Sequence, residues 1–156
     1  MTRTNISTRH LTLITAGTGK TGRRVVERLK ALGVPTRIGS RSADLPFDWN
    51  DRSTWAPVLD GVTSIYIVYY PDLAVSGASE AIQAFVDLAV ESGAQKLVLL
   101  SGRGEEEARR CEEIVQNAGV DWTVLRATWF SQNFSEGFMR DLVLGGTVAL
   151  RAGGVR

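Results

Sequence analysis

The chain has 156 residues, which is enough for one well-packed core but not for two large ones. Its 18 Lys and Arg almost balance its 17 Asp and Glu, so net charge gives no general attraction to nucleic acid or to an anionic membrane. The single cysteine, Cys111, excludes an internal disulfide and suits a reducing compartment. The first ten residues are polar, unlike a signal peptide. We therefore expect a cytoplasmic protein with a flexible tail at 1–10 and one domain at 11–156, binding neither nucleic acid nor membrane.

Apolar, β-branched runs alternate with helical patterns along the whole chain. In chain order, the residues predict a strand at 11–14, a helix ending at Gly33, strands at 34–39 and 47–49, a helix at 54–59, a strand at 64–70, a helix at 80–92, a strand at 96–100, a helix at 105–117, a strand at 122–125, a helix at 131–144 and a short strand at 147–150. Strands separated by helices predict βαβ units. We expect an α/β fold, a doubly wound parallel sheet of the Rossmann type with helices on both faces. Strand order should reverse between the first and fourth strands.

The loop after the first strand carries three glycines in G-x-G-x-x-G spacing. In such a loop the first glycine permits a tight turn, the second lets the backbone approach a pyrophosphate, and the third allows close helix–strand packing. The following helix N-terminus offers N–H groups and a partial positive charge to an anion. The predicted cofactor-binding residues here are Gly17, Thr18, Gly19, Lys20, Thr21 and Gly22. The alternative is a glycine-rich turn that serves only packing.

The end of the second strand indicates which dinucleotide would bind. NAD-specific sites place an acidic residue there for the ribose 2′-OH, whereas an arginine accommodates a 2′-phosphate. This chain has Ser40 and Arg41 and no Asp or Glu at that point. Arg41 can form forked hydrogen bonds to a phosphate, and Lys20 adds a second positive charge. The residues favour NADP(H) over NAD(H), although either side chain could instead be an ordinary solvated one.

Four stretches of the sequence together resemble a known family. They are AGTGKTG at 16–22, GSRS at 39–42, FDWND followed by TW at 47–55, and GVDWTVLR running into WFSQNF at 119–134. They are similar to the NmrA-like, atypical short-chain dehydrogenase/reductases, which include type-2 NADPH:quinone reductases. The resemblance implies that Asp48 and Trp49 lie beside the adenine and that Tyr69 borders the cofactor. It also implies a substrate pocket lined by Tyr70, Trp129, Phe130 and Asn133.

The chain departs from the wider family in two ways. The helix at 105–117 lacks the Tyr-x-x-x-Lys pair that donates a proton during carbonyl reduction. Quinone reduction remains open to such a site, because hydride can pass to an electron-poor ring while water supplies the proton. Family members also continue past residue 156 into a smaller lobe over the substrate, so we expect slow turnover from these residues alone.

The remaining candidates are few. Ser101 ends a strand at the carboxyl edge, so it either contacts the nicotinamide ribose or substrate, or caps a helix. His10 has no ligand cluster, so no metal is expected, and Cys111 lies on an apolar helix stripe as a buried cysteine would. No catalytic residue is assigned.

Two functions stay open: an NADPH-dependent reductase of a quinone or similar conjugated acceptor, or a non-catalytic NADP(H) sensor with a protein partner. Homo-oligomerisation is also open.

Overall fold

A computed structural model describes residues 10–128, 130–136 and 139–146. By its internal contacts the chain divides into two compact units, Met1–Arg126 and Ala127–Arg156. The described part of the second unit holds two short helices, α5 (Gln132–Glu136) and α6 (Met139–Leu144). That residues 11–156 act as a single domain stays a prediction.

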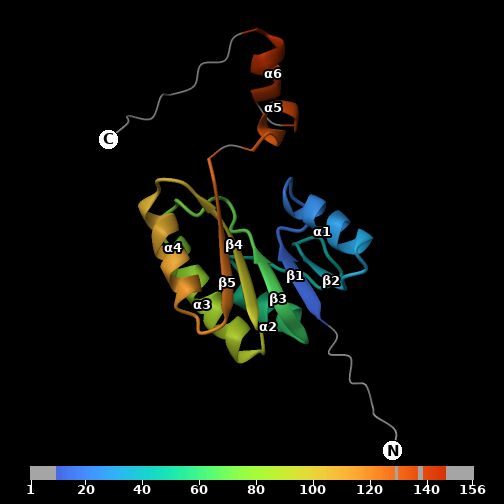
Figure 1. Cartoon of the computed structure of the whole chain (residues 1–156), viewed down its shortest axis with the longest axis vertical. Helices are drawn as coiled ribbons and strands as arrows, with labels where there is room; N and C mark the ends of the chain where they lie inside the picture. Colours follow the sequence, from blue (N-terminus) through green and yellow to red (C-terminus); the bar gives the residue numbers. More distant parts are fainter. Residues whose placement is uncertain (1–9, 129, 137–138, 147–156) are drawn as a thin grey trace, which may run out of the picture. The chain divides into compact units, whose positions relative to one another are not determined.

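The first unit is built around one five-stranded sheet (Figure 1). Its elements are β1 (Leu11–Thr15), α1 (Gly22–Ala31), β2 (Thr36–Gly39), a 3₁₀ turn η1 (Arg52–Thr54), α2 (Trp55–Leu59), β3 (Val62–Ile67), α3 (Ala78–Glu91), β4 (Lys96–Gly102), α4 (Glu106–Gln116) and β5 (Asp121–Ala127). The strand order is β2-β1-β3-β4-β5, and β1 pairs in parallel with both β2 and β3. The order therefore reverses at β1, which confirms the predicted reversal.

Helices cover both faces of the sheet, which confirms the predicted fold class. Side chains alternate along a strand, so Leu13 faces α2, α3 and α4 while its neighbour Ile14 faces α1. The larger core lies on the first of these faces, where Phe85 of α3 is fully buried. The smaller cluster is formed by Ile14, Val26 of α1 and Tyr66. Figure 1 shows α3 and α4 on one side of the strands and α1 on the other.

The prediction of a strand at 47–49 is wrong. This segment makes only an isolated bridge between Asp48 and Asp51. Its backbone is satisfied elsewhere: the Phe47 N–H donates to the Ser40 carbonyl and the Asp48 N–H donates to Thr54 Oγ1. The aromatic residues that suggested a strand are instead buried in the core, where the Trp49 ring packs on its neighbours.

The helix predicted at 131–144 is divided into α5 and α6 on either side of residues 137–138, which lie outside the described residues. The strand predicted at 147–150 also lies outside them. Among the helices that the structure describes, none is long and apolar enough to cross a membrane.

Candidate cofactor-binding site

The glycine loop joins β1 to α1 at the carboxyl edge of the sheet. The Gly17 N–H donates to the Gly39 carbonyl at 3.1 Å, and the Gly19 N–H donates to the Ala16 carbonyl at 2.8 Å. A Cβ added at Gly17 would stand 2.8 Å from Ile38 Cγ2, and one at Gly22 would stand 2.2 Å from the Ala16 oxygen. The first and third glycines are thus required by close packing against β2 and against the loop itself.

The middle glycine has a different environment. A Cβ at Gly19 would meet only Ala16, at 3.1 Å from its carbonyl oxygen, and Gly19 is exposed. The α1 N-cap residue, Thr21, makes no side-chain capping bond, and the first turn of α1 contains no acidic residue. Backbone N–H groups and the positive end of the helix dipole are therefore available to an anion beside Gly19.

A pocket of about 230 Å³ opens beside this loop. Its lining comes from the glycine loop, the end of β2, the segment after it and the turn after β3: Ala16, Thr18, Gly19, Gly39, Ser40, Arg41, Phe47, Asp48, Trp49, Asn50 and Tyr70. A larger hollow of about 690 Å³ lies between α3 and α4, but none of the predicted site residues lines it. The pocket at the strand ends, where open α/β sheets bind ligands, is therefore the candidate site.

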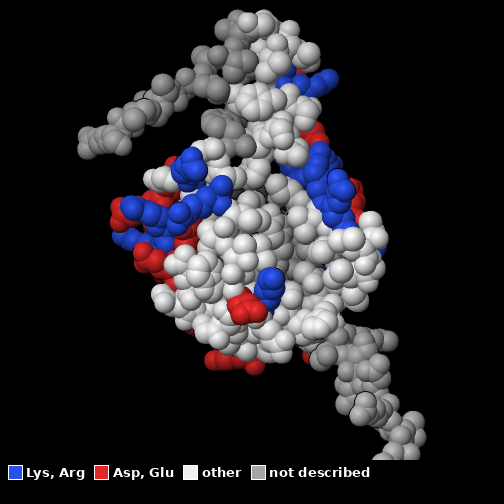
Figure 2. Space-filling view, in the orientation of Figure 1, with Lys and Arg blue, Asp and Glu red and all other residues white. Residues whose placement is uncertain are grey.

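Hydroxyl groups gather where the glycine loop meets the end of β2. Ser40 Oγ lies 3.1 Å from both Thr18 Oγ1 and Ser42 Oγ, and Arg41 follows it on the exposed rim. Lys20 is also exposed, and Figure 2 shows Lys and Arg side chains gathered over α1 next to the loop. Hydroxyl donors beside a guanidinium suit an anionic group such as a phosphate.

Asp48 and Trp49 both line the pocket. The Trp49 indole N–H donates to the Val68 carbonyl at 3.0 Å, and its ring lies 5.0 Å from that of Tyr69. Asp48 Oδ1 accepts from the Asn50 N–H at 2.9 Å. Burial raises the pKa of the Tyr69 phenol, so it stays neutral near pH 7. Trp49 and Tyr69 therefore form a fixed aromatic support, while Asp48 keeps a carboxylate at the rim.

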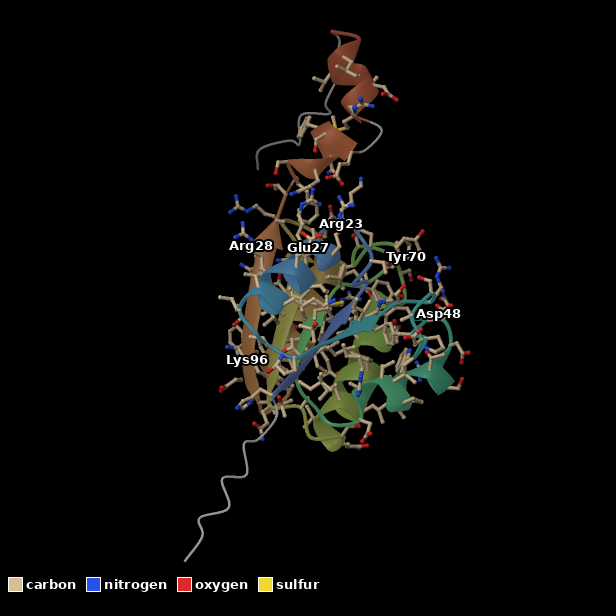
Figure 3. All side chains as sticks on the ribbon, turned by 90° about the vertical axis from the view of Figure 1, so that its right-hand side faces the viewer. Arg23, Glu27, Arg28, Asp48, Tyr70 and Lys96 are labelled. Atoms are coloured by element: carbon tan, nitrogen blue, oxygen red, sulfur yellow. The ribbon has the colours of Figure 1, made fainter. Side chains whose placement is uncertain are left out.

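Tyr70 lies with the predicted cofactor residues. The Arg41 guanidinium carbon is 5.9 Å from the centroid of the Tyr70 ring, and both side chains line the pocket. Figure 3 shows Tyr70 on the same side of the molecule as Asp48, which lines the same pocket. Ser101, by contrast, is the last residue but one of β4, which is separated from β1 by β3. The placement of Tyr70 in a substrate pocket stays a proposal, but its contacts here are on the Arg41 side.

Ser101 belongs to a polar network around the buried Glu112 carboxylate, which the sequence did not reveal. Ser101 Oγ donates to Glu112 Oε1 at 2.6 Å, and Arg126 reaches both Glu112 oxygens through Nε and Nη2. Hydrogen bonds from Arg126, followed by the one from Ser101, hold the pKa of the Glu112 carboxyl below its ordinary value despite burial. The carboxylate thus holds the Ser101 proton. The one sequence signal was an acidic residue directly after Cys111, on the buried stripe of α4.

The other predicted residues can be placed more briefly. Cys111 is fully buried, as expected, and burial raises the pKa of its thiol to about 12. Within the described residues, no group of three or more His, Cys, Asp or Glu could hold a metal ion. Phe130 and Asn133 belong to the second unit, and Trp129 lies outside the described residues. Their role in a substrate pocket stays a proposal.

Comparison with known proteins agrees with this fold. No model of a protein family matches the sequence. The chain is 31% identical to the prestalk A differentiation protein A of Dictyostelium discoideum, over 97% of this chain and 56% of that protein. It is 30% identical to an agroclavine dehydrogenase of Claviceps fusiformis, over 79% of this chain and 48% of that protein. The chain spans about half the length of the curated relatives it matches.

Solved structures show the same fold at low identity. The triphenylmethane reductase of Citrobacter sp., complexed with NADP(H), superposes with a TM-score of 0.70 at 16% identity, covering 92% of this chain and 58% of that one. The fold and the relatives place the chain in a class of NAD(P)-binding oxidoreductases. Within that class, the chain belongs to the NmrA-like atypical short-chain dehydrogenase/reductase family.

Proposed function

We propose that this chain binds NADPH and supports its oxidation by a quinone or similar conjugated acceptor. The observation that carries the proposal is the pocket at the glycine loop, whose rim holds Arg41 and the hydroxyls of Ser40 and Thr18. No acidic residue stands at the end of β2, where an NAD-specific site would hold one. The pocket therefore suits the additional phosphate of NADPH.

Each part of the site has a role under this proposal. Gly19 and the N-terminus of α1 hold the pyrophosphate, and Asp48 and Trp49 lie beside the adenine. The bound dinucleotide would supply hydride, so the protein mainly orients the reactants. The Ser101 hydroxyl proton already has acceptors within the chain, Glu112 Oε1 at 2.6 Å and the Gly102 carbonyl at 3.5 Å, so Ser101 is not the expected proton donor. A Tyr–Lys proton donor is also absent from α4, so water is the proton source and the acceptor must be one that needs little acid catalysis.

A spectrophotometric assay tests this function. NADPH absorbance should fall, slowly, when quinones are added to the chain, and it should not fall with aldehydes or simple ketones. Binding of NADPH without oxidation by any quinone would contradict the enzymatic proposal. It would favour the second function, a non-catalytic NADP(H) sensor with a protein partner, which the missing proton donor also supports. Rapid reduction of an unactivated ketone would instead require a proton donor other than Ser101 or a Tyr–Lys pair on α4.

Arg41 should set the preference for NADPH over NADH. Replacing Arg41 by Ala removes a charge-assisted contact worth about 1.5–3 kcal/mol, so NADPH should bind roughly 10- to 150-fold more weakly. The affinity for NADH should hardly change. Arg41→Lys is the matched variant, because it keeps the charge and loses the planar fork. Calorimetric titrations measure each affinity, and equal losses for both dinucleotides would show that Arg41 does not read the 2′-phosphate.

A further inference from the structure

The two faces of the sheet carry opposite charge. On one face lies α1, whose ten residues include four cations and one acid: Arg23, Arg24, Arg28, Lys30 and Glu27. On the other face lie α3 and α4, and α3 contains three acids and no cation. The sheet separates these surfaces, as Figure 1 shows, so they cannot meet within one copy of the chain. A second copy can bring them together.

The hollow between α3 and α4 is a groove lined by apolar and acidic side chains. Val90 and Ile114 line it and stay partly exposed. Three exposed acids line it as well: Asp87, Glu91 and Glu113. Among the described residues, the one Lys or Arg in its lining is Arg110, which lies 2.7 Å from Glu106 Oε1 and 3.5 Å from Glu107 Oε2 and is therefore already paired. The groove keeps uncovered apolar surface beside an excess of negative charge.

Two of these acids are unfavourable for the helices that carry them. Glu91 is the last residue of α3 and Glu113 lies in the last turn of α4, where the helix dipole is negative. Neither last turn contains a basic residue. The stability of α3 and α4 therefore does not account for the acids, whereas a cationic occupant of the groove would. On α1, by contrast, Arg28 and Lys30 also complement the dipole of their own helix.

We propose that the basic surface of α1 on one copy of this chain docks in the α3–α4 groove of a second copy. Arg28 and Lys30 are both exposed, and side chains of this kind can lay their aliphatic stems over Val90 and Ile114 while their charged ends reach the acids. Like charges oppose a contact of α1 with α1 or of groove with groove, so the contact is head to tail. It involves no dinucleotide and is independent of the proposed function.

Analytical ultracentrifugation of the unchanged chain, without dinucleotide, tests whether the contact forms. Each added copy leaves one α1 and one groove open, so the mass should rise with concentration from the 17.0 kDa monomer past the dimer. An ionic strength of about 1 M shortens the Debye length to about 3 Å and should return the chain to the monomer. A monomer at every concentration in low salt, or a dimer that grows no further, would overturn the proposal.

Charge reversal identifies the two surfaces. Glu91→Lys and Arg28→Glu should each weaken the association about tenfold or more. Asp121→Lys and Lys96→Glu make the same charge changes at exposed positions outside both surfaces, and should associate like the unchanged chain. Glu91→Lys should also keep or raise the urea midpoint, because a cation suits the end of α3, so its loss of association is not a loss of fold.

Mixing the two reversed variants gives the sharpest test. The Arg28→Glu copy keeps an acidic groove and the Glu91→Lys copy keeps a basic α1, so the mixture should associate more strongly than either variant alone. A loss caused by misfolding would persist in the mixture. A mixture that stays monomeric, or control variants that weaken as much as the reversed ones, would show that α1 and the groove do not bind each other.

Discussion

Replacing Gly22 by Ala should destabilise the fold by about 3 kcal/mol or more. The added Cβ would stand 2.2 Å from the Ala16 carbonyl oxygen and 2.9 Å from Gly17 Cα. Both are backbone atoms, so no side chain can turn aside and the loop must move. The higher helix propensity of alanine, worth about 1 kcal/mol, offsets only part of this cost.

Thermal or urea unfolding measures the Gly22 effect. For a chain of this size the melting temperature should fall by roughly 6–12 °C. Gly102→Ala is the matched control, because a Cβ there would meet only Glu105 Cγ, at an ordinary 3.8 Å. Its melting temperature should stay close to that of the unchanged chain. Equal melting temperatures for the two variants would show that α1 does not approach the glycine loop closely at Gly22.

Gly19→Val should abolish dinucleotide binding while the fold is largely retained. The added Cβ would make one tight contact on the protein side, 3.1 Å from the Ala16 carbonyl oxygen, so we expect a stability loss of about 1 kcal/mol. On the ligand side it would occupy the position where the pyrophosphate approaches the backbone. We expect the affinity for NADPH and NADH alike to fall about 100-fold or more.

Calorimetric titration and far-UV circular dichroism of the same samples distinguish the two effects of Gly19→Val. Gly19→Ala makes the same first contact without the branched methyl groups and should lose less affinity. A folded Gly19→Val protein that binds NADPH normally would mean that the loop is only a packing turn. Substitution of Gly19 should therefore remove dinucleotide binding with little loss of stability. Substitution of Gly22, three residues later, should mainly destabilise the fold.

The order and type of most elements could be predicted from the sequence because local patterns dictate them. Ser64–Ile67, for example, is the core of β3, and the glycine spacing marks the turn between β1 and α1. The segment at 47–49 differs from its prediction because aromatic residues favour strands and buried clusters equally, and only the tertiary contacts of Trp49 distinguish the two.

The sequence predicts those parts of the candidate site whose residues lie close together in one segment. Thr18, Gly19, Ser40 and Arg41 follow directly from the loop and from the end of β2, and the structure brings them together in one pocket. The Ser101–Glu112–Arg126 network joins three elements, and no periodicity links residues so far apart. The contact of Tyr70 with Arg41 likewise depends on how two separate turns approach each other.

Calorimetric titration of the unchanged chain with NADPH, NADP⁺, NADH and NAD⁺ measures directly whether the pocket at the glycine loop binds a dinucleotide. We expect saturable binding at one site, with NADPH and NADP⁺ bound more tightly than NADH and NAD⁺ by the factor that Arg41→Ala removes. We also expect that Gly19→Val, still folded, shows no binding heat. The absence of saturable binding by any of the four dinucleotides to the folded chain would contradict dinucleotide binding at this pocket.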